Sequence, residues 1–238
     1  MVSKGYGNIF FNEKTEVEQK HNFLSVLFGY EEKFKNKRSK KEIIDFVNEY
    51  LHVDKYAANA IHQYFREQFL YLEIPNDKKI LIEHYNEDNK KYVIFHALFG
   101  RRVNDCLSRA IAYAIGKLQH KDVEIGINDN GFFLSYEGNA QVLQAFKLLK
   151  SEKIRLLLEL AIKDSEIFKR RFRHCATRSL MILREYKGRK KRVGRQQVSS
   201  MLLISALRRI SEDFSILKEA KREVLEDLMD IENTTKVL

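Results

Sequence analysis

The sequence is poor in the residues that break, cross-link or anchor a chain. Its 238 residues include one proline, two cysteines and no tryptophan. An average proline usage of about 5% would give roughly twelve, so the sequence predicts long helices. Cys106 and Cys175 are too few for a disulfide framework or a four-cysteine zinc site. We therefore expect a reducing, cytoplasmic location.

Long apolar runs are also missing. The longest nearly apolar stretch, residues 92–100, is far shorter than the ~20 residues that cross a bilayer. The first seven residues lack the apolar centre of a signal peptide. Nevertheless 44% of the residues are hydrophobic, which is enough to bury a core. The sequence thus predicts a folded protein without a membrane partner.

Common catalytic motifs are absent. The sequence contains no Gly-Lys-Ser/Thr, Gly-x-Gly-x-x-Gly, Gly-x-Ser-x-Gly or His-Glu-x-x-His pattern. His174 beside Cys175 is the nearest approach to a metal site or a Cys–His nucleophile. Neighbouring residues on a helix point about 100° apart, however, so a packed or patch-lining pair is favoured. We expect no cofactor, no metal and no catalytic residue in this chain, and its status as an enzyme stays open.

Positive charge is concentrated in one segment. The formal net charge is +10, from 43 basic and 33 acidic residues. Between residues 169 and 195 the only acid is Glu185, whereas the rest of the chain holds 31 bases and 32 acids. The sequence thus predicts a basic surface that favours phosphate groups. The bases of this segment are Lys169, Arg170, Arg171, Arg173, Arg178, Arg184, Lys187, Arg189, Lys190, Lys191, Arg192 and Arg195.

The pattern of apolar residues predicts an α+β fold, mainly helical, with two β-hairpins flanking a central helix. We expect a poorly assignable segment over 1–38, with one helix over 16–30, then a helical pair over 39–75, and an α+β region over 76–238. Ser39 and Glu42 have the spacing of a capping box, and Asp54 is the expected cap of the next helix.

The α+β region divides further by periodicity. Strands are expected over 79–85 and 92–97, and over 123–127 and 132–136, with the central helix over 101–118. The second pair is joined by Asn128-Asp129-Asn130-Gly131, which predicts a turn rather than a site. Helices follow over 142–149, 151–161, 167–183, 195–210 and 214–229, with a basic loop bracketed by Gly188 and Gly194.

The helix over 167–183 has two interpretations. Its apolar positions predict a packing face of Phe168, Phe172, Cys175, Ala176, Ser179, Leu180 and Leu183. Its arginines cannot all share one face, and some are expected to pair with acids such as Glu159, Asp164 or Glu166. The helix is then either a salt-bridged surface helix or a surface that follows the backbone of a single-stranded nucleic acid, which the basic loop favours.

Two further features have open alternatives. Tyr186, before the basic loop, could stack on a base or pack in the core. Gly100-Arg101-Arg102 opens the central helix and is either a phosphate clamp or a turn with structural ion pairs. The candidate nucleic-acid-binding residues are Arg101, Arg102, Arg170, Arg171, Arg173, Arg178, Lys187, Arg189, Lys190, Lys191, Arg192 and Arg195.

Three blocks together resemble one known family. They are Phe95-His96-Ala97-Leu98-Phe99-Gly100-Arg101-Arg102-Val103-Asn104-Asp105, residues 123–132, and residues 172–184 with Tyr186-Lys187-Gly188-Arg189. From about Ser39 to the end, the chain resembles the DEAD/H-associated domain of Lhr-type superfamily 2 helicases. It looks similar to archaeal members of that family. The resemblance implies an accessory domain, with ATP and Mg²⁺ used only by a motor whose motifs lie elsewhere. No family catalytic residue has a counterpart here.

The resemblance implies single-stranded DNA as partner and DNA unwinding or repair as process, while DNA against RNA stays open. The family domain continues beyond the position of Leu238, so we expect a fragment, a split subunit or a remnant. The alternative is a basic scaffold that docks a separate helicase motor subunit. A small enzyme ranks last, because no nucleophile or base stands out.

Overall fold

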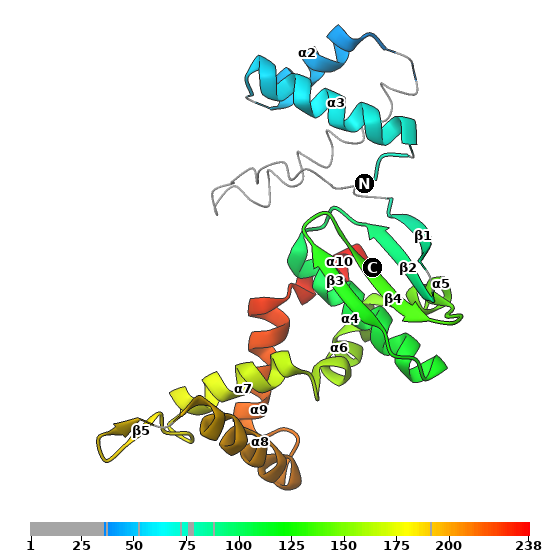
Figure 1. Ribbon diagram of the computed structural model, residues 1–238. Helices are drawn as coiled ribbons and strands as arrows, with labels where there is room; N and C mark the ends of the chain where they lie inside the picture. The colour runs from blue at the N-terminus through cyan, green and yellow to red at the C-terminus, as the bar shows by residue number, and fades with distance from the viewer. Residues whose placement is uncertain are drawn as a thin grey trace. The chain divides into compact units, whose positions relative to one another are not determined.

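The computed structural model describes residues 36, 38–51, 53–71, 73–75, 79–87, 89–190 and 192–238, and the helix expected over 16–30 lies outside them (Figure 1). The chain divides into two compact units. The first comprises residues up to 81 with 96–98, and the second comprises 82–95 with 99–238. The domain boundaries at 38, 75 and 76 stay predictions.

The first unit contains the predicted helical pair, α2 (Lys40–Tyr50) and α3 (Lys55–Tyr71). The predicted N-cap at Ser39 is confirmed, because the Glu42 N–H donates to Ser39 Oγ at 3.3 Å. Glu42 accepts from the Ser39 hydroxyl at 3.0 Å, a side-chain contact in place of the backbone bond of a full capping box. The cap at Asp54 is also confirmed, with its Oδ1 accepting from the Ala57 N–H at 2.7 Å. The pair packs around a core of Ile43, Val47, Ala58, Phe65 and Ile74.

Both predicted hairpins form, and they join into a single sheet. Its strands are β1 (Leu81–Glu87), β2 (Lys90–His96), β3 (Glu124–Asn128) and β4 (Gly131–Glu137), in the order β1-β2-β4-β3. The central helix α4 (Arg101–Gln119) packs against β3 and β4. The α+β fold is thus confirmed, while the pairing of the two hairpins through β2 and β4 was outside the sequence prediction.

Aromatic and aliphatic side chains fill the space under the sheet. The rings of Phe95 on β2 and Phe132 on β4 stack with centroids 4.5 Å apart, and both residues are buried. The loop of the second hairpin consists of Asp129 and Asn130, as predicted for a turn. The buried Asn104 of α4 donates to the carbonyls of residues 128 and 129, which ties this turn to the helix.

Helices follow the sheet, as predicted. They are α5 (Val142–Lys147), a short 3₁₀ turn η1 (Ser151–Lys153), α6 (Ile154–Ile162), α7 (Glu166–Arg178), α8 (Val193–Ile210), α9 (Ser215–Arg222), a π-helical segment η2 (Glu223–Leu228) and α10 (Ile231–Val237). In the second unit, α7 packs against α8, α9 and η2, and α10 packs against α4 and α6. Among the described residues, no helix is both long and apolar enough to span a membrane.

The predicted helix over 167–183 is too long at its C-terminal end. Helix α7 ends at Arg178, because Leu180 adopts a left-handed conformation with φ 59°. The N–H groups of Leu180 and Ile182 then satisfy the carbonyls of Thr177 and Ala176, as helix-ending turns do. The packing face is confirmed at Phe168, Phe172, Cys175 and Ala176, but wrong at Ser179, Leu180 and Leu183, which are exposed.

The predicted basic loop is a short β-hairpin. Strand β5 (Glu185–Tyr186) pairs with β6 (Arg189–Lys190) in antiparallel register around a two-residue turn. Lys187 and Gly188 have φ values of 50° and 72°, the combination of a type I′ turn that suits the twist of a hairpin. Helix α8 starts two residues earlier than predicted, so Gly194 lies in its first turn.

The C-terminal helix predicted over 214–229 consists of two segments, α9 and η2, and is followed by a separate helix, α10. After α9, the chain widens into the π-helical η2, where the Met229 N–H donates to the carbonyl of Val224, five residues earlier, at 2.9 Å. Asp230 then caps α10 by accepting from the Asn233 N–H. The apolar period identified the helix but gave no signal for the wider turn or for α10.

Candidate nucleic-acid interface

Helix α7, the β5–β6 hairpin and the start of α8 follow one another along the chain (Figure 1), and basic residues occur on all three. Seven of them share one property: in the part of the chain that the structure describes, no carboxylate lies within 4.0 Å of their charged groups. We call these seven the open basic set, namely Arg170, Arg173, Arg184, Arg189, Lys190, Arg192 and Arg195.

The hairpin places part of this set in solvent. Arg189 and Lys190 form strand β6 and are exposed, as are Arg192 and Arg195 at the start of α8. The one acid of the hairpin, Glu185, lies opposite Lys190 in the ladder without forming an ion pair within 4.0 Å. The type I′ turn thus holds a two-stranded, positively charged hairpin on which Arg189 and Lys190 are exposed to an anion.

His174 on α7 reports the electrostatic effect of the cluster. Its pKa is lowered below the ordinary 6.5, first by burial and then by the neighbouring charges of Arg173, Arg171, Arg170 and Arg184. A proton on this imidazole would have to coexist with several guanidinium groups. The same positive potential that disfavours the proton attracts phosphate groups.

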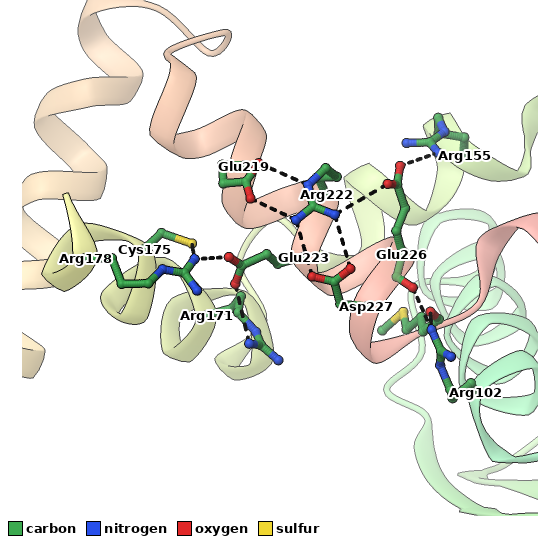
Figure 2. A network of polar contacts seen from close by, with 11 residues as sticks. Arg102, Arg155, Arg171, Cys175, Arg178, Glu219, Arg222, Glu223, Glu226 and Asp227 are labelled. Atoms are coloured by element: carbon green, nitrogen blue, oxygen red, sulfur yellow. Dashed lines mark hydrogen bonds and ion pairs between the residues drawn. The ribbon is translucent and has the colours of Figure 1, made fainter. Parts of the chain in front are cut away.

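Two predicted binding residues on α7 hold a buried acid instead. Glu223, the first residue of η2, is 3% exposed, and its carboxylate accepts a hydrogen bond from Arg178 (Figure 2). Its second oxygen lies 3.4 Å from Nη1 of Arg171. Because a buried carboxylate without a cation is costly, these two arginines hold η2 against α7. The Arg178 side chain is nonetheless 60% exposed.

On the other side of η2, Arg222 gathers three acids. It donates to Glu219 and Asp227 at 2.9–3.3 Å and lies 3.7 Å from Glu226, which also pairs with Arg155 at 2.9 Å (Figure 2). Both hydrogen bonding to Glu219 and the positive charge of Arg222 lower the pKa of Glu219. The π-helical segment is thus held by arginines on both sides.

Arg102 anchors the far end of this segment. Its guanidinium donates to the carbonyls of Glu226 and Met229 at 2.6 and 2.9 Å (Figure 2). Gly100 has φ 85°, which makes the turn before α4. Gly100 thus makes the expected turn, while Arg102 has backbone carbonyls as partners rather than the acids of the structural alternative. The phosphate clamp stays a prediction. We call Arg102, Arg155, Arg171, Arg178 and Arg222 the paired arginine set.

The remaining candidates lie as follows. Arg101 is exposed at the first residue of α4, a different element from the open basic set. Lys187 is exposed in the hairpin turn. Lys191 lies outside the described residues, and the side chain of Tyr186 does as well, so its two interpretations stay open.

The acids expected to neutralise α7 pair elsewhere, apart from Glu166, which pairs with Lys169 at 2.7 Å. Asp164 pairs with Arg208, and Glu159 lies 3.9 Å from Lys221. Glu223, the acid that does bind α7 arginines, is 45 residues from Arg178 in sequence. In the sequence, only its position next to Val224 and Leu225, on the apolar stripe of a predicted helix, indicates that Glu223 is buried.

The other chemistries that the sequence raised are a metal site and a cysteine nucleophile. Among the described residues, no group of three or more His, Cys, Asp or Glu side chains could hold a metal ion. Cys106 and Cys175 are both free and buried, and burial raises the pKa of the Cys106 thiol to about 11, which makes it a poor nucleophile. Cys175 accepts a hydrogen bond from Arg178 and is likewise buried, whereas His174 beside it is only partly buried among the arginines of α7.

Comparisons with known proteins agree on one family. A family model described as DEAD/H associated matches residues 74–238. The chain is 50% identical over 217 residues to the ATP-dependent helicase Lhr-Core of Methanothermobacter thermautotrophicus, covering 91% of this chain and 25% of that protein. It is 41% identical over 208 residues to the Lhr-Core helicase of Sulfolobus acidocaldarius, covering 85% and 24%.

The fold is similar to that of a solved Lhr structure. The Mycobacterium smegmatis helicase Lhr, bound to ssDNA and AMP-PNP, matches with a TM-score of 0.71 and 24% identity over 84% of this chain and 26% of that one. The chain spans about a quarter of the length of the curated Lhr-Core relatives just described. The match of the family model over more than half of the chain leads to one conclusion: the chain belongs to the DEAD/H-associated family.

Proposed function

We propose that this chain acts as the accessory domain of an Lhr-type helicase and binds single-stranded DNA through the open basic set. In this proposal the ATP-hydrolysing motor is a part of such a helicase outside the present chain. The open basic set holds the strand by its phosphates, while the paired arginine set keeps α7 and η2 in place behind it. Binding by phosphates predicts little preference for base sequence.

One observation carries the proposal. Seven basic side chains on consecutive elements lack a carboxylate within 4.0 Å among the described residues, although the chain has acids enough to pair with many of its other bases. An unneutralised cluster of this kind costs stability through repulsion, and an anion relieves that cost. A polyanion with regularly spaced phosphates fits an extended row of basic side chains better than a single small anion does.

The test is fluorescence anisotropy with a labelled single strand across a salt series. Arg189→Ala, Lys190→Ala and Arg192→Ala together should weaken binding and reduce the slope of log K against log salt by about 2, at ~0.7 per phosphate contact. The matched control replaces three exposed lysines elsewhere by alanine, namely Lys147, Lys150 and Lys153, and should leave the slope unchanged. An equal loss in both variants, or no binding at low salt, contradicts the proposal.

The same assay addresses the type of nucleic acid. An RNA strand of identical sequence measures whether the 2′-hydroxyl adds or removes affinity, because phosphate contacts alone treat the two backbones alike. Tighter binding to RNA than to DNA at every salt concentration would redirect the proposal to RNA.

A further inference from the structure

Helix α8 carries an apolar strip on its solvent side. Val198, Met201 and Leu202 are 58%, 52% and 67% exposed. Met201 and Leu202 follow Val198 by three and four residues, so all three lie on one side of the helix. The buried residues Ser200 and Ile204 mark the opposite side, and α8 packs against α7. The strip is thus a second exposed feature next to the open basic set.

The electrostatic setting of the strip favours an anionic ligand. Helix α8 contains three arginines and no carboxylate. Arg195 lies three residues before Val198, and Arg209 lies seven residues after Leu202, so both share the side of the strip. Both are exposed, and neither has an ion-pair partner among the described residues. The strip therefore continues the open basic set directly, without a negative charge between them.

Apolar side chains cannot bind phosphates, but they can contact the faces of nucleobases. In a single strand held by Arg189, Arg192 and Arg195 through its phosphates, the bases are free to turn toward a neighbouring surface. Leucine and methionine side chains insert between bases or pack on their faces in other nucleic-acid-binding proteins. In a duplex the base faces are already stacked on each other, so contact with this strip would require unstacking them at a cost of about a few kcal/mol per step.

We propose that Val198, Met201 and Leu202 form a base-contacting subsite that receives unstacked bases of the strand bound by the open basic set. This inference rests on the proposed function and adds to it a group of residues and a part of the ligand. The phosphates give affinity through the hairpin and the start of α8, and the strip selects nucleic acid whose base faces are accessible.

The experiment separates bases from backbone. The full chain is titrated with a fluorescent oligothymidylate of about 20 nucleotides, with an abasic strand of the same length and charge, and with a duplex. The subsite predicts about tenfold tighter binding of the oligothymidylate than of the abasic strand. Val198→Ser, Met201→Ser and Leu202→Ser together should abolish that difference while leaving the salt slope unchanged.

The control replaces two exposed leucines of another helix, Leu156→Ser and Leu160→Ser on α6, and should preserve the difference. Because all five side chains are exposed, these variants are expected to fold, which circular dichroism checks. Equal affinity of the unsubstituted chain for the two strands overturns the subsite while the proposed function stands. Failure to bind either strand overturns both. A strip variant that keeps its preference for thymidylate also overturns the subsite.

Discussion

The two groups of basic residues around α7 have the same chemistry and opposite surroundings. Arg171 and Arg178 converge on the buried Glu223, and Arg102 and Arg222 hold the rest of η2. The open basic set, from the same helix through the following hairpin to the start of α8, has no such partner among the described residues. Charge counted along the sequence therefore overestimates the charge that a ligand can use. The distinction depends on which residues the fold brings beside each arginine.

The largest predicted effect concerns the paired side of the comparison. Glu223→Ala removes the buried carboxylate that accepts a charged hydrogen bond, and should lower the free energy of unfolding by about 2 kcal/mol. Urea denaturation measures the change as a lower midpoint at constant slope. Glu219→Ala is the matched control, because this exposed acid holds Arg222 together with two other carboxylates and its loss should change little. Equal midpoints for Glu223→Ala and the unsubstituted chain would show that the pairing is unimportant.

The adjacent residues Arg170 and Arg171 allow the sharpest comparison on one helix. Arg171→Gln should lower stability by about 1 kcal/mol, since it loses an ion pair to a buried acid, while affinity for single-stranded DNA changes little. Arg170→Gln should reverse this result, with unchanged stability and a salt slope smaller by about 0.7. Chemical denaturation and anisotropy are measured on both variants. The comparison breaks down if the two substitutions give the same pair of changes.

The hairpin offers a test by backbone strain. Gly188→Ala forces a side chain into φ +72°, which costs about 1 kcal/mol locally, although nothing within 4 Å obstructs the new Cβ. We expect faster amide exchange in β5 and β6 and weaker DNA binding, with the global midpoint unchanged. Gly194→Ala is the control, because it also meets no atom within 4 Å but lies in α8 without a positive φ, so helix formation should improve. Weaker binding in Gly194→Ala alone would contradict the assignment of the hairpin.

The smallest effect is a pH dependence. The pKa values of His174 and His62 are lowered below 6.5, in each case first by burial. The unfolded chain therefore binds these protons more readily than the folded one, so stability is complete above pH 6.5 and declines as the pH falls below it. Denaturation midpoints between neutral and mildly acidic pH measure the decline. A double variant, His62→Gln with His174→Gln, should show a flatter profile, and an identical profile would remove the two histidines as its cause.

Much of the fold could be predicted because its signals are local. The caps at Ser39 and Asp54, the turn at Asp129-Asn130 and the helical stripes each depend on residues within a few positions. The early end of α7 at Leu180 and the widening of the helix after Arg222 lack such signals, because packing against distant segments decides them. The site was predictable only as a set of candidates. Glu223 is far from α7 in sequence, and only the fold shows that it forms ion pairs with Arg171 and Arg178.

The most direct test of the account is the NMR spectrum of the arginine side-chain Nε–H groups during titration with a single-stranded oligothymidylate. Each guanidinium reports separately on whether a phosphate approaches it. We predict large shifts for Arg170, Arg184, Arg189, Arg192 and Arg195, and small ones for Arg102, Arg171 and Arg222, which already have partners. Shifts spread evenly over both groups, or confined to the paired arginine set, would contradict the distinction between open and paired charge.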